Sequence, residues 1–240
     1  RQLCYNLLQE NTMPSIFQMS FQSMLYILLI RLIIALTALP IHECAHAYAA
    51  MRMGDHTAER QGRLTLNPLA HFDPIGTTAI ILFGFGWAKP VPINPLNFEN
   101  PKKGMMLSAL AGPLSNIGMA FLAMVGYKLT PLLAYIGLGT AFVTTLSTFF
   151  FYAMSINISL GVFNLIPIPP LDGSRIATYF LPQKTYFKIM QYERYIFVAF
   201  FIILWLGLLD MPISFVDNLV TGGLDFLTKP INWLVSAIIG

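Results

Sequence analysis

The segment LPIHECAHAYAAMRMG, residues 39–54, places His42, Glu43 and His46 inside a long apolar stretch. The two histidines are four residues apart, so on a helix they lie on one face, one turn apart. The pattern H-E-x-x-H presents two imidazoles to one metal ion, and the glutamate beside them can take a proton from a water on that metal. The alternative is a pair of buried histidines bonded to other polar groups. Because the chain has only four histidines and ionisable groups in a membrane-like helix are costly, the pattern favours a metal site.

A zinc ion in a catalytic site takes three protein ligands and leaves a fourth position for water. The third ligand must lie at the depth of His46, which is six residues before Arg52 and so on the order of 10 Å inside that end of the helix. Asp172 in FNLIPIPPLDGSRI follows prolines that end another helix on the same side. L-D-G is also ordinary turn chemistry, so the residue types alone leave both interpretations open. The need for a third ligand at this depth favours Asp172.

The composition indicates an integral membrane protein. Of the 240 residues, 56% are hydrophobic and only 10% are charged, and the mean hydropathy is +0.65. Soluble domains carry about 25% charged residues. The net charge of +3 gives no basis for a nucleic-acid partner, and the two cysteines, Cys4 and Cys44, do not form a disulfide framework.

Four apolar segments have the length of transmembrane helices. They cover residues 21–53, 104–129, 138–165 and 192–209. Residues 75–87 are apolar but too short to span, so we expect a re-entrant or interfacial piece there, with a β-hairpin as the favoured form. The tail, residues 212–240, lies in the interface or forms one more partial span. The predicted fold is therefore an all-α membrane protein, a polytopic helical bundle of about four to six membrane segments with a short re-entrant or β-hairpin element.

Basic residues gather in two of the connections between these segments. They are Arg52, Arg60, Arg63, Lys89, Lys102 and Lys103 in the first connection, and Arg175, Lys184, Lys188 and Arg194 in the third. By the positive-inside rule both connections are cytoplasmic. Arg31, in the middle of the first segment, is expected to face other helices or to reach the outer surface with its long side chain.

HECAHAYAA together with NLIPIPPLDG resembles the site-2 protease family of intramembrane zinc metalloproteases. The matching positions are His42, Glu43 and His46, and Asn164, Pro167, Pro169, Asp172 and Gly173. The stretches GRLTLNPLAHFDPIGT, GWAKPVPINP and LAGPLSN are also similar, so the resemblance covers roughly residues 34–176. Cys44 departs from the large apolar residue expected at its position, and a packing change is the expected effect.

The resemblance implies one zinc ion bound by His42, His46 and Asp172, with Glu43 as the general base. It implies a single membrane-embedded protease domain, residues 1–240, with a core at 21–176 and C-terminal membrane segments at 192–240. No inserted PDZ-like domain is seen between the segments. We expect a multi-pass protein of a prokaryotic cell membrane, with its active site toward the cytoplasm.

Further polar residues are weaker candidates. Asn116 and Asn164 either bond neighbouring helices or donate to the carbonyl oxygen as it becomes an oxyanion. His71 is a further metal ligand, a residue that hydrogen-bonds to the ligands, or a residue that caps the loop HFDP. Residues 87–91 either form an interfacial loop or pair as an exposed strand edge with an unwound substrate. The substrate-binding candidates in this stretch are Trp87, Ala88 and Lys89.

The sequence thus predicts a zinc metalloprotease that hydrolyses peptide bonds in or near transmembrane segments of membrane proteins. This substrate class comes from the resemblance. The main alternative is a membrane metal-binding or metal-handling protein without hydrolysis, and Glu43 argues against it because metal binding alone does not require a base. A second alternative is a scaffold that binds substrates without cutting them, which the complete set of ligands and base disfavours.

Overall fold

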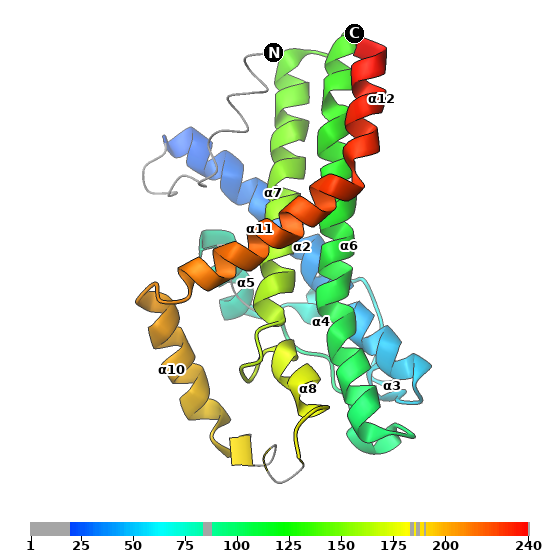
Figure 1. The fold of residues 1–240 in the computed structure, drawn as a ribbon, viewed down its shortest axis with the longest axis vertical. Coiled ribbons are helices and arrows are strands. Elements are labelled where there is room, and N and C mark those ends of the chain that lie inside the picture. The colour runs from blue at the N-terminus through cyan, green and yellow to red at the C-terminus, as the bar shows by residue number, and fades with distance from the viewer. Residues whose placement is uncertain (1–19, 84–87, 183–184, 186–187, 190, 240) are drawn as a thin grey trace.

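In the computed structural model, the described part of the chain comprises residues 20–83, 88–182, 185, 188–189 and 191–239. All regular elements within it are helical, and no β-strand occurs among these residues. Three of the helices are long and apolar enough to cross a membrane, or four if the bent pair near the C-terminus is one span. The all-α prediction is therefore confirmed for this part of the chain (Figure 1).

Helix α2, Phe21–Arg52, carries the histidine motif. Its first turn is capped by the hydroxyl of Ser20, which accepts from the backbone N–H of Ser23. It ends before Gly54, whose φ of 103° lies in the left-handed region that favours glycine. The helix therefore starts and ends within one residue of the predicted segment.

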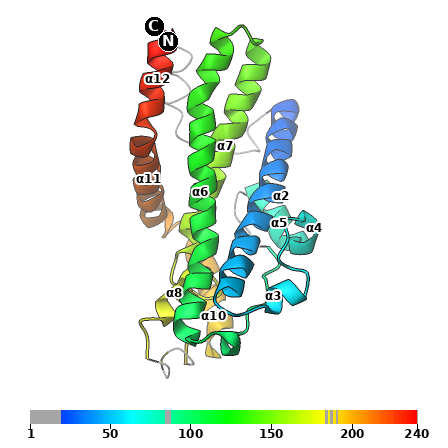
Figure 2. The ribbon, with the colours of Figure 1, turned by 90° about the vertical axis from the view of Figure 1, so that its right-hand side faces the viewer.

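Helices α6, Pro101–Tyr135, and α7, Thr140–Asn164, form a long antiparallel hairpin against which α2 packs (Figure 2). The contact between α2 and α7 uses small residues, because Ala35 and Ala38 are fully buried against Ile156 and its neighbours. Small side chains let helix backbones approach closely, which is how helices associate in lipid. This packing fixes the three helices relative to one another one to two turns before His42 on α2.

The connection from α2 to α6 corrects one expectation. Residues Pro74–Phe83, where a β-hairpin was expected, form helix α5, whose first N–H groups at Ile75 and Gly76 are capped by the carboxylate of Asp73. Ten residues rise only about 15 Å, so α5 is too short to cross a membrane. Arg31 of α2 donates to the carbonyl oxygen of Leu82 near the end of α5, at 3.4 Å. An apolar β-prone composition was overridden here by this cap and by packing against α2.

Shorter elements complete this connection and the one after α7. They are α3, Thr57–Arg60, α4, Pro68–His71, the 3-10 helix η2, Pro95–Asn97, and α8, Asp172–Thr178. Elements α3 and α8 and the start of α6 lie at the same end of the bundle in both views (Figures 1 and 2). The prolines after α7 end that helix as predicted, and α8 begins directly at Asp172.

The C-terminal region consists of α10, Glu193–Trp205, α11, Asp210–Leu227, and α12, Lys229–Ile239. The fourth predicted segment is broken, because α10 has only 13 residues and α11 turns away from it by 84°. Helix α11 lies obliquely across α6 and α7 (Figure 1). A salt bridge of 2.7 Å between Lys128 and Asp225 fastens it to α6.

Candidate metal centre

His42 and His46 point from one face of α2 into the bundle, as their spacing predicts. Both are buried, their rings meet edge to face with centroids 4.6 Å apart, and their Nε2 atoms are 3.0 Å apart. The two Nε2 atoms are thus directed at one point beside α2, a helix that is apolar enough to cross a membrane.

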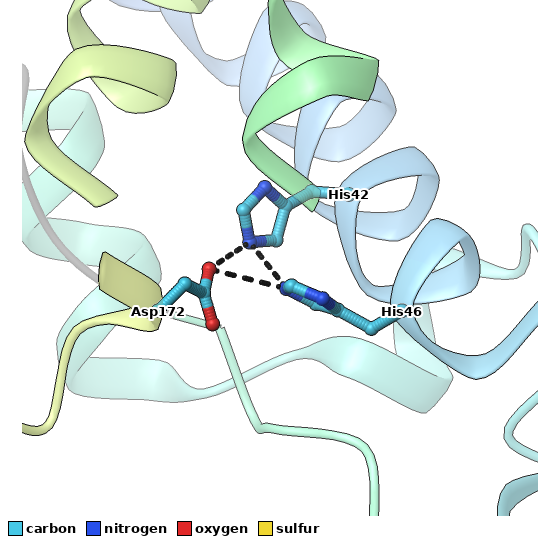
Figure 3. A group of neighbouring side chains, drawn as sticks. All are labelled: His42, His46 and Asp172. Atoms are coloured by element: carbon cyan, nitrogen blue, oxygen red, sulfur yellow. Dashed lines mark hydrogen bonds and ion pairs between the residues drawn. The ribbon is translucent and has the colours of Figure 1, made fainter. Parts of the chain in front are cut away.

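Asp172, the first residue of α8, completes the cluster (Figure 3). Its Oδ2 atom is 3.2 Å from Nε2 of His42 and 3.2 Å from Nε2 of His46. The structure therefore brings Asp172 next to His42 and His46, although Asp172 lies 126 positions after His46 in the sequence.

The donor set fits a zinc ion. Nδ1 of His46 faces the carbonyl oxygen of Ser108 at 2.7 Å, and a carbonyl only accepts, so Nδ1 carries the proton and Nε2 a lone pair. Lone pairs of imidazole and a carboxylate oxygen directed at one point repel one another unless a cation lies between them. Two histidines and one carboxylate are a common catalytic zinc set that leaves one position open.

Helix α6 holds the outer nitrogens of both histidines. Ser108 and Asn116 lie eight residues apart on one face, with the backbone oxygen of Ser108 at Nδ1 of His46 and Oδ1 of Asn116 at Nδ1 of His42. Gly112 lies midway between them, and a Cβ there would overlap both imidazole rings. The absence of a side chain at residue 112 thus allows α6 to approach the metal centre.

Glu43 lies beside the cluster and is buried. Its Oε2 atom accepts a hydrogen bond of 2.9 Å from the backbone N–H of Val91, in the irregular segment at residues 88–94. That segment is anchored at both ends, because the side chain of Arg63 donates to the carbonyl of Lys89 at 2.7 Å and Asp55 accepts from the N–H of Asn94 at 2.7 Å.

A cavity of about 200 Å³ opens onto these residues. Besides the three ligand candidates and Glu43, its polar lining consists of Asn116, Asn164 and Arg175. Ala88 and Val91 contribute apolar lining from the segment after α5. The site is therefore a concave, mostly apolar chamber with a few convergent polar groups, which is the usual form of a binding site.

The weaker sequence candidates fall in different places. Asn116 is fully buried and both ends of its amide are bonded, to His42 and to Asn157. Asn164 lines the cavity and donates to the carbonyl of Leu160 at 2.9 Å. Trp87 lies outside the described residues.

His71 lies outside the metal cluster, in α4. It is buried, and its Nε2 atom faces the carbonyl oxygen of Thr65 at 2.9 Å. Its own carbonyl accepts from the N–H of Lys89 at 2.9 Å, so His71 helps to hold the segment that contains Ala88 and Lys89. Ala88 is buried and Lys89 is exposed.

Sequence reasoning did not single out Ser108, Gly112 or Asn157, and it included Val91 only as the end of the stretch 87–91 that was a candidate substrate contact. Ser108 and Val91 act through backbone atoms, which leave no signal in residue type. The spacing of four between Ser108, Gly112 and Asn116 was visible, and it could have marked one face of a helix.

Comparison with known proteins agrees with the fold and the site. The model of peptidase family M50 matches residues 128–207. The chain is 43% identical over 183 residues to a Bacillus subtilis protein named "Putative zinc metalloprotease YwhC", an alignment that covers 75% of this chain and 81% of the relative. The chain therefore belongs to peptidase family M50, the site-2 protease type of zinc metalloprotease.

More distant relatives carry similar names. The chain is 32% identical over 147 residues to "Putative zinc metalloprotease Rip2" of Mycolicibacterium smegmatis, covering 58% of this chain and 52% of that protein. The Rip2 protein of Mycobacterium tuberculosis H37Rv is 32% identical over 145 residues, with the same coverage. The chain thus spans about half the length of the Rip2 proteins. No solved structure gives a significant match.

Proposed function

We propose that this zinc metalloprotease cuts peptide bonds in or near the transmembrane segments of other membrane proteins. The observation that carries the proposal is the position of His42, Glu43 and His46 inside α2, a helix apolar and long enough to cross a bilayer. A site at that depth meets chains that are themselves in the membrane. The proposed ligands are His42, His46 and Asp172.

The site is proposed to face the cytoplasm. His46 is six residues from Arg52, so it lies on the order of 10 Å inside the end of α2. That end connects to the Arg- and Lys-rich loop before α6, and such loops stay on the cytoplasmic side. Water would enter from the same side through the cavity, whose lining includes Arg175.

Glu43 is the proposed general base. A zinc ion in the site would lower the pKa of a bound water and polarise the scissile carbonyl. Glu43 accepts the proton of the attacking water and passes it to the leaving amine. The hydrogen bond from Val91 holds one carboxylate oxygen of Glu43, which fixes the direction of the side chain. Both asparagines line the cavity, but the amide of Asn116 is bonded at both ends whereas Asn164 has one bond, from Nδ2 to the carbonyl of Leu160, so we propose Asn164 for the oxyanion.

The segment from Ala88 to Asn94 is the proposed substrate contact. A transmembrane helix must unwind before its carbonyls become accessible, and the unwound backbone needs new partners. This segment has no regular secondary structure, lines the cavity and is held by Arg63 and His71. A photo-crosslinking side chain in place of the exposed Lys89 should label a bound membrane peptide. Absence of labelling under cleavage conditions contradicts this contact.

A cleavage assay distinguishes the proposed proteolysis from the alternative function, metal binding without hydrolysis. Detergent-purified protein is incubated with peptides that contain a transmembrane segment, with zinc, with a chelator, and with zinc restored after chelation. We expect cleavage only when zinc is present. Zinc binding without cleavage of any peptide that the protein binds would favour the alternative.

A further inference from the structure

A chain of side-chain hydrogen bonds connects all three long helices behind the metal centre. Asn157 of α7 donates from Nδ2 to the carbonyl oxygen of Ala153 at 2.8 Å. Its Oδ1 accepts from Nδ2 of Asn116 of α6 at 3.0 Å. Oδ1 of Asn116 in turn contacts Nδ1 of His42 of α2. All three side chains are buried, with Asn116 fully so and Asn157 only 4% exposed.

The chain of hydrogen bonds has one direction, because it ends at the backbone carbonyl of Ala153, which can only accept. A backbone carbonyl has no proton, so the amide of Asn157 must turn its NH₂ group toward Ala153. Its oxygen therefore faces Asn116, which must present its own NH₂ group. The oxygen of Asn116 is then left to face His42.

The proton on His42 follows from this order. An amide oxygen only accepts, so Nδ1 of His42 must carry the ring proton. Nε2 then carries the lone pair, 3.2 Å from Oδ2 of Asp172. We infer that Asn157 is a positioning residue that sets the tautomer of His42 through Asn116, and so keeps Nε2 available to the metal. This inference rests on the zinc site in the proposed function.

Asn116 alone does not set the tautomer. An amide rotated by half a turn occupies almost the same space, and it would then offer its NH₂ group to His42. Nδ1 would have to accept and Nε2 would hold the proton, so Nε2 could not bind the metal. With Asn157 in place, the wrong rotamer of Asn116 puts two amide oxygens face to face in a buried site, where a lost hydrogen bond is expensive.

His46 supplies an internal comparison. Its Nδ1 faces the backbone oxygen of Ser108, which cannot rotate. No side chain is needed to direct that contact, so Asn157 is expected to act on His42 and not on His46. The arrangement also gives a role to a polar side chain at position 157, in a helix apolar enough to cross a membrane.

The test replaces Asn157 by a residue of similar size without polar atoms. Zinc affinity of detergent-purified Asn157→Leu is measured by competition with a chromophoric chelator, beside Thr148→Val as a control. Thr148 also bonds a carbonyl four residues back on α7 but lies outside the chain of hydrogen bonds. Loss of a partner behind a metal ligand typically lowers metal affinity by about 10- to 100-fold. We expect a loss in that range for Asn157→Leu and none for Thr148→Val.

A second substitution separates orientation from packing. Asn116→Asp places a carboxylate at the same point, and both of its oxygens accept, so it holds the Nδ1 proton whichever way it rotates. Adding Asn116→Asp to Asn157→Leu should therefore restore zinc affinity. Unchanged affinity in Asn157→Leu, or a loss that Asn116→Asp does not restore, would overturn the inference.

Nitrogen-15 NMR of histidine-labelled, metal-free protein reads the tautomer directly. We expect the Nδ1–H form of His42 in the wild type and a shift toward the Nε2–H form in Asn157→Leu. The same tautomer in both proteins would contradict the inference. A tautomer change in a protein that binds no zinc would support the chain of hydrogen bonds and refute the proposed function, so the two are tested separately.

Discussion

The backbone N–H of Val91 donates a hydrogen bond of 2.9 Å to Oε2 of Glu43, although the two residues are 48 positions apart in sequence. This contact connects the loop after the short helix α5 to the proposed general base. Arg63, His71 and Asp55 in turn hold that loop. The direction of the Glu43 carboxylate therefore depends on residues far from the H-E-x-x-H motif.

Val91→Pro should slow cleavage while zinc content stays unchanged, because proline has no N–H to donate to Glu43. A hydrogen bond to a charged group contributes about 1.5–3 kcal/mol, which corresponds to about a tenfold or larger loss of rate. Cleavage kinetics and metal analysis are the measurements. Val91→Ala is the matched control, because it keeps the N–H and should cut much faster than Val91→Pro. Equal rates for the two variants would remove this contact from the mechanism.

His42→Ala, His46→Ala and Asp172→Ala should each lower the zinc content of the purified protein. The donor atoms of these residues lie within 4.8 Å of one another, and each variant deletes one of the three proposed ligands. Metal analysis after gel filtration is the check. His56→Ala, an exposed histidine paired with Glu59, should keep its zinc. Full retention in Asp172→Ala would exclude that carboxylate as a ligand.

Gly112→Ala should lower zinc affinity by about tenfold or more, because the added methyl group would displace both histidines from α6 and their outer hydrogen bonds. Gly118→Ala on the same helix is the control, since a Cβ there meets open space. Chelator competition measures both. If the two alanine variants bind zinc equally well, the close approach of α6 has no role in holding the imidazoles.

Asp55 should make the stability of the loop depend on pH. Burial alone would raise the pKa of its carboxyl, but hydrogen bonds from Thr57, Asn97 and Asn94 hold that pKa below its usual range. A lowered pKa stabilises the folded state above the unfolded pKa of about 3.9, and this contribution is lost as pH falls through the lower folded value.

Asp55→Asn should therefore lower the free energy of unfolding by about 1–3 kcal/mol at neutral pH, and the difference from wild type should shrink below about pH 4. Thermal unfolding in detergent at both pH values is the measurement. The exposed Glu59→Gln should change the melting temperature little. A difference for Asp55→Asn that grows as the pH falls would have the wrong sign for this account.

The sequence predicted the elements of the centre that depend on side-chain type and helical spacing. His42 and His46 followed from a spacing of four, and Asp172 from the prolines that end α7 at the same depth. The β-prone composition of Pro74–Phe83 favoured a hairpin, although Asp73 before Pro74 is a helix-start signal in the sequence, and Asp73 caps the helix in the structure. Asn157 gave no signal, because a lone amide in an apolar helix is as typical of helix packing as of a metal centre.

The central claim is that Glu43 is the base of a zinc protease, and the measurement that tests it most directly is the cleavage rate of Glu43→Gln at equal zinc content. Glutamine is close to glutamate in shape but cannot take a proton. Proton transfer by a positioned side chain typically contributes about 10²–10⁴-fold to the rate. We predict that Glu43→Gln binds zinc like the wild type and cuts a transmembrane peptide at least about 100-fold more slowly. Cleavage at the wild-type rate by the zinc-loaded variant would contradict the account.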